Sequence, residues 1–263
     1  HWEMRVQASD DWKYFIGTQQ PPATWRDINF NDNSWSNGPG GIGYADGDDA
    51  TIIQACSSVY LRRDFTISNV SEILQMAFYI DYDDSFVAYV NDVEIARSNI
   101  GIPGDYPAYN TMPDNYHEAL MYQGGEPESY LISSQIFAGL LQQGTNTLSI
   151  QVNNYGATSS DLSAIPYLFV ATSSTSSNGI PLPSWFNITS NNFSSHLPLL
   201  SINTNGQVIQ DAYRIVADLS AFMNDNGNQN YLTDIPTNYN DKISIEIRGH
   251  SSQMFEKKAY SME

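Results

Sequence analysis

Hydrophobic and polar positions alternate most clearly between Ile80 and Ala96, in the stretch IDYDDSFVAYVNDVEIA. From Phe86 to Val90 every second side chain falls on the same face, which is the period of a β-strand. Asn91 and Asp92 separate this run from Val93–Ile95, and both residue types tolerate the positive φ angles that a two-residue hairpin turn needs. The pattern therefore predicts a β-hairpin.

The same alternation recurs along the first two thirds of the chain, separated by clusters of Gly, Pro, Asn and Ser. The strands it predicts are Ser57–Ile67, Ile73–Tyr82, Thr147–Tyr155 and Ile165–Thr172. Short strands separated by turn residues, with few helical windows, predict an all-β antiparallel sandwich. Pairing of early with late strands would make it a jelly roll. The stretch Gly101–Gly125 is long and rich in Tyr, Pro and Asn, and we interpret it as a functional or packing loop.

After Thr172 the sequence becomes rich in Ser, Asn and Pro, and this change in composition divides the chain into three segments. Residues 1–172 form the sandwich, residues 173–196 form a Ser/Asn/Pro-rich linker, and residues 197–263 form a second, β-rich module. About 65 residues give little surface to bury in a core of their own. We therefore expect the second module to be the first part of a larger α+β domain that continues past Glu263.

Composition also limits the classes of molecule that the chain can bind. The net charge of −18 excludes nucleic acid, because the phosphate backbone would be repelled, and it disfavours anionic membrane surfaces. The sequence has no long apolar run, so membrane insertion is not expected. Cys56 is the only cysteine, which excludes an internal disulfide. The polar, aromatic-rich composition and the start at His1 suggest a mature or trimmed protein that is secreted or at the cell surface.

Carboxylates are concentrated in two places. Asp46, Asp48 and Asp49 follow a glycine-rich loop, and Asp81, Asp83 and Asp84 precede the predicted hairpin, although strands normally avoid Asp. Calcium takes several oxygen ligands from flexible loops, and loops at one end of a sandwich converge. We therefore predict a structural calcium site, with solvated acidic loops or Asx-turns as the alternative.

Aromatic residues supply a second kind of candidate site. Ring faces pack on the CH groups of sugars, so exposed aromatics near Asn and Asp favour a glycan or surface polymer as ligand. The alternative is that most of these rings belong to the core. The tyrosines of the long, Tyr-rich Gly101–Tyr122 loop are the ones we expect to lie outside it. The predicted ligand-binding residues are Trp35, Tyr44, Tyr82, Tyr106, Tyr109 and Tyr155.

Residues 1–172 also resemble a known family. The runs FNDNSW, GPGGIGYADGDD, IDYDDSFVAYVNDVEIAR and GTNTLSIQVNN are similar to those of a galactose-binding-like jelly roll. That family usually has glycines where this chain has Ser85 and Asp92, a change that the same geometry tolerates. Its members are often part of secreted bacterial multidomain proteins. The resemblance adds Asp161, in SSDLS, as a third contributor to the metal site.

Residues 197–263 resemble the opening of the CotH family of spore-coat kinases. The shared signature is a strand that ends in Arg248-Gly249, a Ser-rich turn, and then Lys257-Lys258. The resemblance implies that Arg248, Lys257 and Lys258 would lie on the nucleotide side of a complete domain. Alternatively, the two lysines are a surface basic pair. The family's catalytic aspartates come later, so no catalytic residue is predicted within this chain and enzyme activity stays open.

Three functions remain open. The first is a secreted or cell-surface module for attachment or adhesion, non-catalytic, carbohydrate-binding and stabilised by calcium. The second is the targeting part of a CotH-like kinase. The third is a structural assembly protein that uses the sandwich to contact other surface proteins.

Overall fold

A computed structural model describes residues 1–132, 139–174, 180–186, 194–195, 197–204, 206–223, 230–231, 236, 239–249 and 259–263. The chain forms two compact units, His1–Trp185 and Phe186–Glu263. No helix in these ranges is long and apolar enough to cross a membrane.

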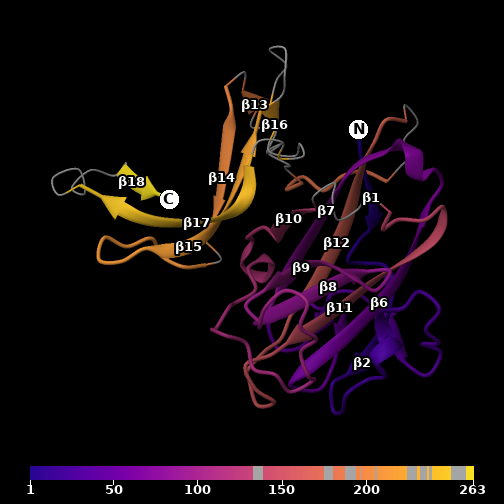
Figure 1. Ribbon diagram of the computed structural model, residues 1–263. Coiled ribbons are helices and arrows are strands. Elements are labelled where there is room, and N and C mark those ends of the chain that lie inside the picture. Colours follow the sequence, from indigo (N-terminus) through magenta and orange to yellow (C-terminus); the bar gives the residue numbers. More distant parts are fainter. Residues whose placement is uncertain are drawn as a thin grey trace. The chain divides into compact units, whose positions relative to one another are not determined.

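The first unit is a sandwich of two antiparallel sheets (Figure 1). The four-stranded sheet has the order β1-β12-β7-β10, and the six-stranded sheet has the order β3-β2-β6-β11-β8-β9. In the described connections lie a short parallel pair, β4 with β5, and three 3-10 helices. The bounds are β1 (Trp2–Val6), β2 (Asp11–Ile16), η1 (Ala23–Arg26), β3 (Ser36–Pro39), β4 (Ile42–Gly43), β5 (Thr51–Ile52), β6 (Ser58–Ile67), η2 (Val70–Glu72), β7 (Ile73–Tyr82), β8 (Ser85–Val90), β9 (Val93–Ser98), η3 (Met121–Gln123), β10 (Glu128–Ile132), β11 (Gly144–Asn153) and β12 (Ala164–Thr172).

The alternation seen in the sequence produces this sandwich. On one face of β7 and β6, alternate residues such as Phe78, Ile80 and Leu61 are fully buried in the core shared by the two sheets. β1 pairs with β12, so the first and last strands of the unit lie side by side as a jelly roll requires. The predicted all-β antiparallel sandwich is confirmed.

The predicted hairpin is β8 with β9. Val90 pairs with Val93, and the intervening Asn91 and Asp92 have φ angles of 50° and 72°. Both values suit a two-residue turn whose twist matches the strands. The Asn91 side chain also donates to the Leu140 carbonyl at 2.9 Å, which ties the turn to the neighbouring loop.

The predicted linker begins as part of the sandwich. The Trp185 ring lies 5.5 Å from Tyr79, 4.8 Å from Tyr167 and 6.1 Å from Phe169, between ring centroids. These three side chains belong to β7 and β12 and face away from the core between the sheets. Trp185 therefore covers the outer face of the four-stranded sheet, and the first unit extends to this residue.

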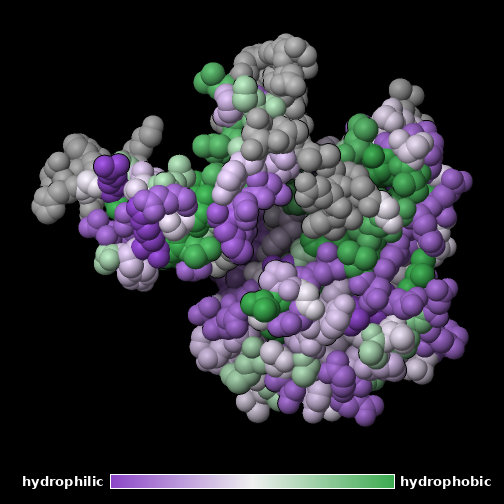
Figure 2. Space-filling model, viewed as in Figure 1, coloured by the Kyte–Doolittle hydropathy of each residue, from purple (hydrophilic) through white to green (hydrophobic). Residues whose placement is uncertain are grey.

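The second unit is a four-stranded antiparallel sheet of order β14-β15-β17-β18 with a separate short pair, β13 and β16. Its small core contains Ile215, Ala217, Ile243 and Ile245. Other apolar side chains of the unit stay exposed, and Figure 2 shows hydrophobic residues among hydrophilic ones on the face in view. The bounds are β13 (Ser194–Ser195), β14 (Leu199–Asn203), β15 (Ile215–Phe222), β16 (Asn230–Tyr231), β17 (Tyr239–Arg248) and β18 (Ala259–Met262).

Candidate metal centre

The loop that joins β4 to β5 carries the first acidic group. Tyr44 anchors its start, because its backbone N–H and C=O both bond to Leu162 at 2.9 and 3.2 Å and its hydroxyl donates to the Ser159 carbonyl. Ala45 and Gly47 then adopt positive φ angles of 83° and 90°. These two left-handed residues bend the loop on either side of Asp46, and Asp48 and Asp49 come back close to it.

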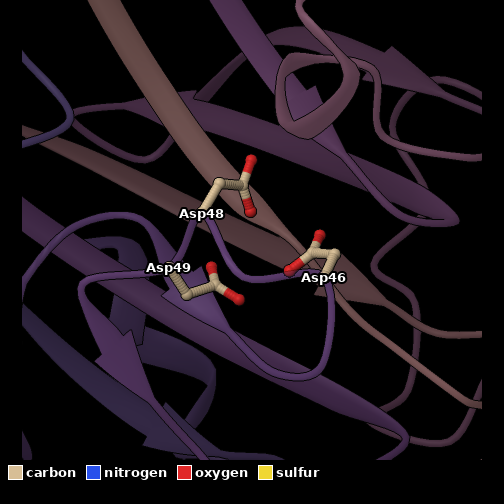
Figure 3. Close-up of side chains that lie close together, drawn as sticks. All are labelled: Asp46, Asp48 and Asp49. Carbon is tan, nitrogen blue, oxygen red and sulfur yellow. The ribbon is translucent and has the colours of Figure 1, made fainter.

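Asp46, Asp48 and Asp49 face one another within this loop (Figure 3). Each offers a carboxylate oxygen, and these oxygens lie within 4.8 Å of one another. Ser163 donates to Asp46 Oδ2. The other oxygen of Asp46 and both oxygens of Asp48 and Asp49 are buried and accept no hydrogen bond from the part of the chain that the structure describes.

Burial and mutual repulsion make it energetically unfavourable for all three carboxylates to be ionised without a counterion. Desolvation, followed by the charge of Asp46, raises the pKa of Asp48 to about 6 and that of Asp49 to about 8. Five buried oxygens without donors are costly, since a buried carboxylate is normally paired, hydrogen-bonded or bound to metal. A cation among the three side chains removes both penalties.

The donor set fits a hard divalent cation. Ligands 2.3–2.6 Å from Ca²⁺ are at most about 5 Å apart, which matches the spacing of these oxygens. The group contains only oxygen ligands, whereas zinc sites use mainly His and Cys. Calcium also tolerates the irregular geometry of a loop better than magnesium does. The predicted residues Asp46, Asp48 and Asp49 therefore form one candidate calcium site.

Two glycines make room for Asp49. A Cβ on Gly43 would lie 1.9 Å from the Leu162 carbonyl oxygen and 2.5 Å from Asp49 Oδ2. A Cβ on Gly41 would lie 3.3 Å from Asp49 Oδ1. The glycine-rich stretch before the acidic residues thus lets a carboxylate lie directly on the backbone.

Asp81 and Asp84, also predicted as metal ligands, have another role in the structure. Asp81 accepts hydrogen bonds from the backbone N–H groups of Leu120 and Met121, both at 2.8 Å. Asp84 accepts from His117 N at 2.9 Å and Tyr155 N at 2.7 Å. Both carboxylates are buried and hold the long loop against the sandwich. Their acidic position before the hairpin is explained by loop anchoring.

The remaining predicted ligands, Asp83 and Asp161, lie together in a different group. Their carboxylates meet that of Glu118, with oxygens of all three within 4.8 Å of one another. Glu118 was missed by sequence reasoning, because it stands alone on the long loop and far from both partners along the chain. Only the fold brings it to them.

Half of the predicted ligand-binding aromatics are core residues. Trp35, Tyr44 and Tyr82 are buried, with 8%, 8% and 1% of their surface exposed. Their rings therefore pack inside the unit and present no face to a sugar. This outcome matches the alternative that the sequence left open for these rings.

The other three predicted aromatics reach the surface. Tyr106 is exposed and its ring lies 3.9 Å from the Arg26 guanidinium carbon. Tyr109 is half-buried, and its N–H donates to the Gln20 side chain. Tyr155 stacks on Tyr116 with centroids 3.8 Å apart, and Tyr116 is 71% exposed. Sequence reasoning missed Tyr116, although its position in a Tyr-rich loop was a usable signal.

Of the three residues expected on the nucleotide side of a complete domain, the structure describes only Arg248. Arg248 is the last residue of β17 and is exposed, and Gly249 follows it with a φ angle of 88°. Lys257 and Lys258 lie outside the described residues.

No family model and no curated protein matches the chain. Similar solved structures include a beta-glucuronidase from Bacteroides uniformis, with 13% identity, a TM-score of 0.42 and coverage of 84% of this chain. A glycosyl hydrolase family 2 member from Bacteroides cellulosilyticus has 10% identity, a TM-score of 0.42 and 83% coverage. An uncultured Clostridium sp. beta-glucuronidase has 12% identity, a TM-score of 0.39 and 100% coverage. The chain spans 22%, 24% and 39% of those proteins. At TM-scores this low, the similarity to these structures carries no conclusion about the function of this chain.

Proposed function

We propose that the first unit is a non-catalytic, calcium-stabilised module that attaches a secreted or cell-surface protein to carbohydrate. The observation that carries the proposal is the set of five buried carboxylate oxygens of Asp46, Asp48 and Asp49 that lack hydrogen-bond donors. Calcium supplies their charge balance and fixes the loop at one end of the sandwich. The calcium is structural, since it holds carboxylates and backbone in place.

The stacked pair Tyr116 and Tyr155 provides the surface for the ligand. An exposed aromatic face is suited to the apolar face of a pyranose, and neighbouring carboxylates can accept hydrogen bonds from its hydroxyls. Asp84 accepts a hydrogen bond from Tyr155 N, so the pair sits beside the acidic loops. A neutral glycan suits this site, because the net charge of −18 repels anionic ligands.

Binding can be tested by electrophoresis in gels that contain neutral polysaccharides and by a glycan array. We expect the wild-type chain to be retained and Tyr116→Ala to lose most retention, because the exposed ring face is removed. Tyr213→Ala, which removes an exposed tyrosine of the second unit, is the matched control and should behave like the wild type. Absence of retention on every glycan, together with concentration-dependent oligomers, would instead favour the assembly function.

The second unit supports a further role for the whole protein, as the targeting part of a CotH-like kinase. Arg248 ends a strand and Gly249 needs the positive φ angle that glycine adopts freely, which is the strand end that the resemblance predicted. ATP-dependent phosphorylation by the full-length protein, abolished when the full-length catalytic aspartates are replaced, tests this role. Failure of that test leaves the attachment function of the first unit unaffected.

A further inference from the structure

A second carboxylate group lies where three distant segments meet. Asp83 lies between β7 and β8, Asp161 lies between β11 and β12, and Glu118 belongs to the long loop before β10. One oxygen of each lies within 4.8 Å of the others. No ion pair among the described residues includes any of the three, so the negative charge of this group has no basic side chain against it.

Asp83 is the unusual member of the group. It is only 3% exposed, yet no N–H group or hydroxyl of the described residues donates to its carboxylate. Its chain neighbours Asp81 and Asp84 are equally buried, and each accepts two backbone N–H groups. A buried carboxylate that instead faces two other carboxylates requires a cation or a proton.

A further oxygen without a donor lies at the edge of the same region. Asn154 is 1% exposed, and its Nδ2 donates to the Asp161 carbonyl at 2.7 Å. Its Oδ1 is buried and accepts no hydrogen bond from the described residues. Asp161 Oδ1 accepts from the neighbouring Ser160 hydroxyl at 2.8 Å, and its second carboxylate oxygen and Asn154 Oδ1 add oxygen ligands of the kind that a hard cation binds.

We propose that Asp83, Glu118 and Asp161 form a second divalent-cation centre, selective for calcium and separate from the Asp46–Asp48–Asp49 site. The spacing of their oxygens fits ligands on one Ca²⁺ ion, as in the first group. Glu118 is exposed and Asp161 half-buried, so water can complete the coordination and the ion can enter from solvent. This centre goes beyond the proposed function, because it does not require the first group to hold calcium.

A cation at this centre would hold the long loop before β10 more firmly to the sandwich. Backbone bonds already hold His117, Leu120 and Met121 to Asp84 and Asp81, and Glu118 lies between those anchors. A cation shared by Glu118, Asp83 and Asp161 would join the loop to the two connections that carry the aspartates. Tyr116 is two residues away, so calcium at this centre would also fix the exposed stacked pair.

The test is a calcium titration by isothermal calorimetry on the chelator-treated chain, combined with hydrogen exchange of residues 114–123. The wild type should bind two equivalents, and calcium should slow exchange in this segment. Glu118→Gln keeps the size of the side chain and removes its charge, and it should lose one equivalent, or bind it at least tenfold more weakly, and lose the slowing. Glu126→Gln removes an exposed charge from the same loop and should behave like the wild type.

Asp48→Asn combined with Asp49→Asn separates the two centres. This variant should lose only the other equivalent and keep the calcium-dependent slowing of exchange in residues 114–123. Identical titrations and exchange for Glu118→Gln and Glu126→Gln, with both variants folded by circular dichroism, would overturn the proposal. That result would leave the first site untouched, whereas loss of binding only in the Asp48 and Asp49 variant would support the first site alone.

Discussion

His117 lies flat on Tyr82, with ring centroids 4.1 Å apart and ring planes inclined by 3°. The same imidazole places Nε2 2.9 Å from Glu128 Oε1 and Nδ1 3.1 Å from the Tyr82 carbonyl oxygen. The hydrogen bond to Glu128 is the main reason that the pKa of His117 is raised. A stack and an ion pair thus fasten the long loop to β7 and β10.

His117→Phe should keep the stack and lose the ion pair. We expect a loss of about 0.5–1 kcal/mol in the free energy of unfolding, the usual range for a partly exposed pair. His117→Ala should cost about 0.5–1.5 kcal/mol more, because the aromatic contact is lost as well. Urea unfolding measures both, and equal losses in the two variants would show that the stack contributes nothing.

Gly43 should be intolerant of even a methyl group. Gly43→Ala places Cβ 1.9 Å from the Leu162 carbonyl oxygen and 2.5 Å from Asp49 Oδ2, so the backbone bridge or the carboxylate has to move. We expect a loss of about 1–3 kcal/mol, typical of overpacking, and a weaker stabilisation by calcium. Gly156→Ala is the control, since its Cβ would meet nothing within 4 Å. Similar melting temperatures for both variants, with and without calcium, would contradict this account of the loop.

Trp185 should stabilise the sandwich from outside its predicted boundary. A fragment of residues 1–172 lacks the ring that packs on Tyr79, Tyr167 and Phe169, and it should melt below a fragment of residues 1–186. Trp185→Ala in the longer fragment should lose about 1–3 kcal/mol, because its contacts with three aromatic rings are removed. If all three melt together in differential scanning calorimetry, Trp185 does not belong to the first unit.

The sequence predicted the strands of the sandwich better than it predicted where the sandwich ends. Alternation along β6, β7 and β8 was sufficient to predict the sandwich and the hairpin, because successive side chains of a strand point to opposite faces. The sequence did not show that β8 is buried on both faces, with Phe86 in the core between the sheets and Tyr89 in a separate aromatic cluster. The linker prediction was less complete, since a single Trp in a Pro-rich stretch has no periodicity that would reveal its contact with a sheet.

The candidate site could be predicted only in part. Asp46, Asp48 and Asp49 are neighbours in sequence, so their clustering follows from one turn. The sequence could not show that Asp81 and Asp84 accept loop N–H groups, or that Glu118 meets Asp83, because these contacts depend on the path of a long irregular loop. Buried and exposed tyrosines likewise look alike in a chain that is 13% aromatic.

The pKa values in the first acidic group predict how the calcium-free chain responds to pH. The pKa of Asp49 is about 8 and that of Asp48 about 6, both above the ordinary value of 3.8, because of burial and the charges of Asp46 and neighbouring carboxylates, including Asp81. Between pH 3.8 and about 8 the folded state therefore binds more protons than the unfolded state, so stability falls as pH rises.

Melting temperatures in EDTA between pH 5 and pH 8 measure this effect. The wild type should lose stability across the range, and Asp48→Asn combined with Asp49→Asn should weaken the dependence, since neither amide titrates. Part of the dependence should remain, because burial also raises the pKa of Asp83, to about 8. Asp11→Asn, which changes an exposed aspartate on β2, is the control. A wild type in EDTA that is more stable at pH 8 than at pH 5 would be opposite to the expected sign.

The central claim is that Asp46, Asp48 and Asp49 bind calcium, and the most direct measurement is the melting temperature of the first unit with calcium and with EDTA. At 100 times the dissociation constant a ligand adds about 2.7 kcal/mol, or roughly 5–10 °C for a domain of this size. We predict a shift of at least this order for the wild type, a smaller one with magnesium, and a clearly smaller calcium shift in Asp48→Asn combined with Asp49→Asn. A melting temperature that EDTA leaves unchanged, or an equal calcium shift in wild type and variant, would contradict the claim.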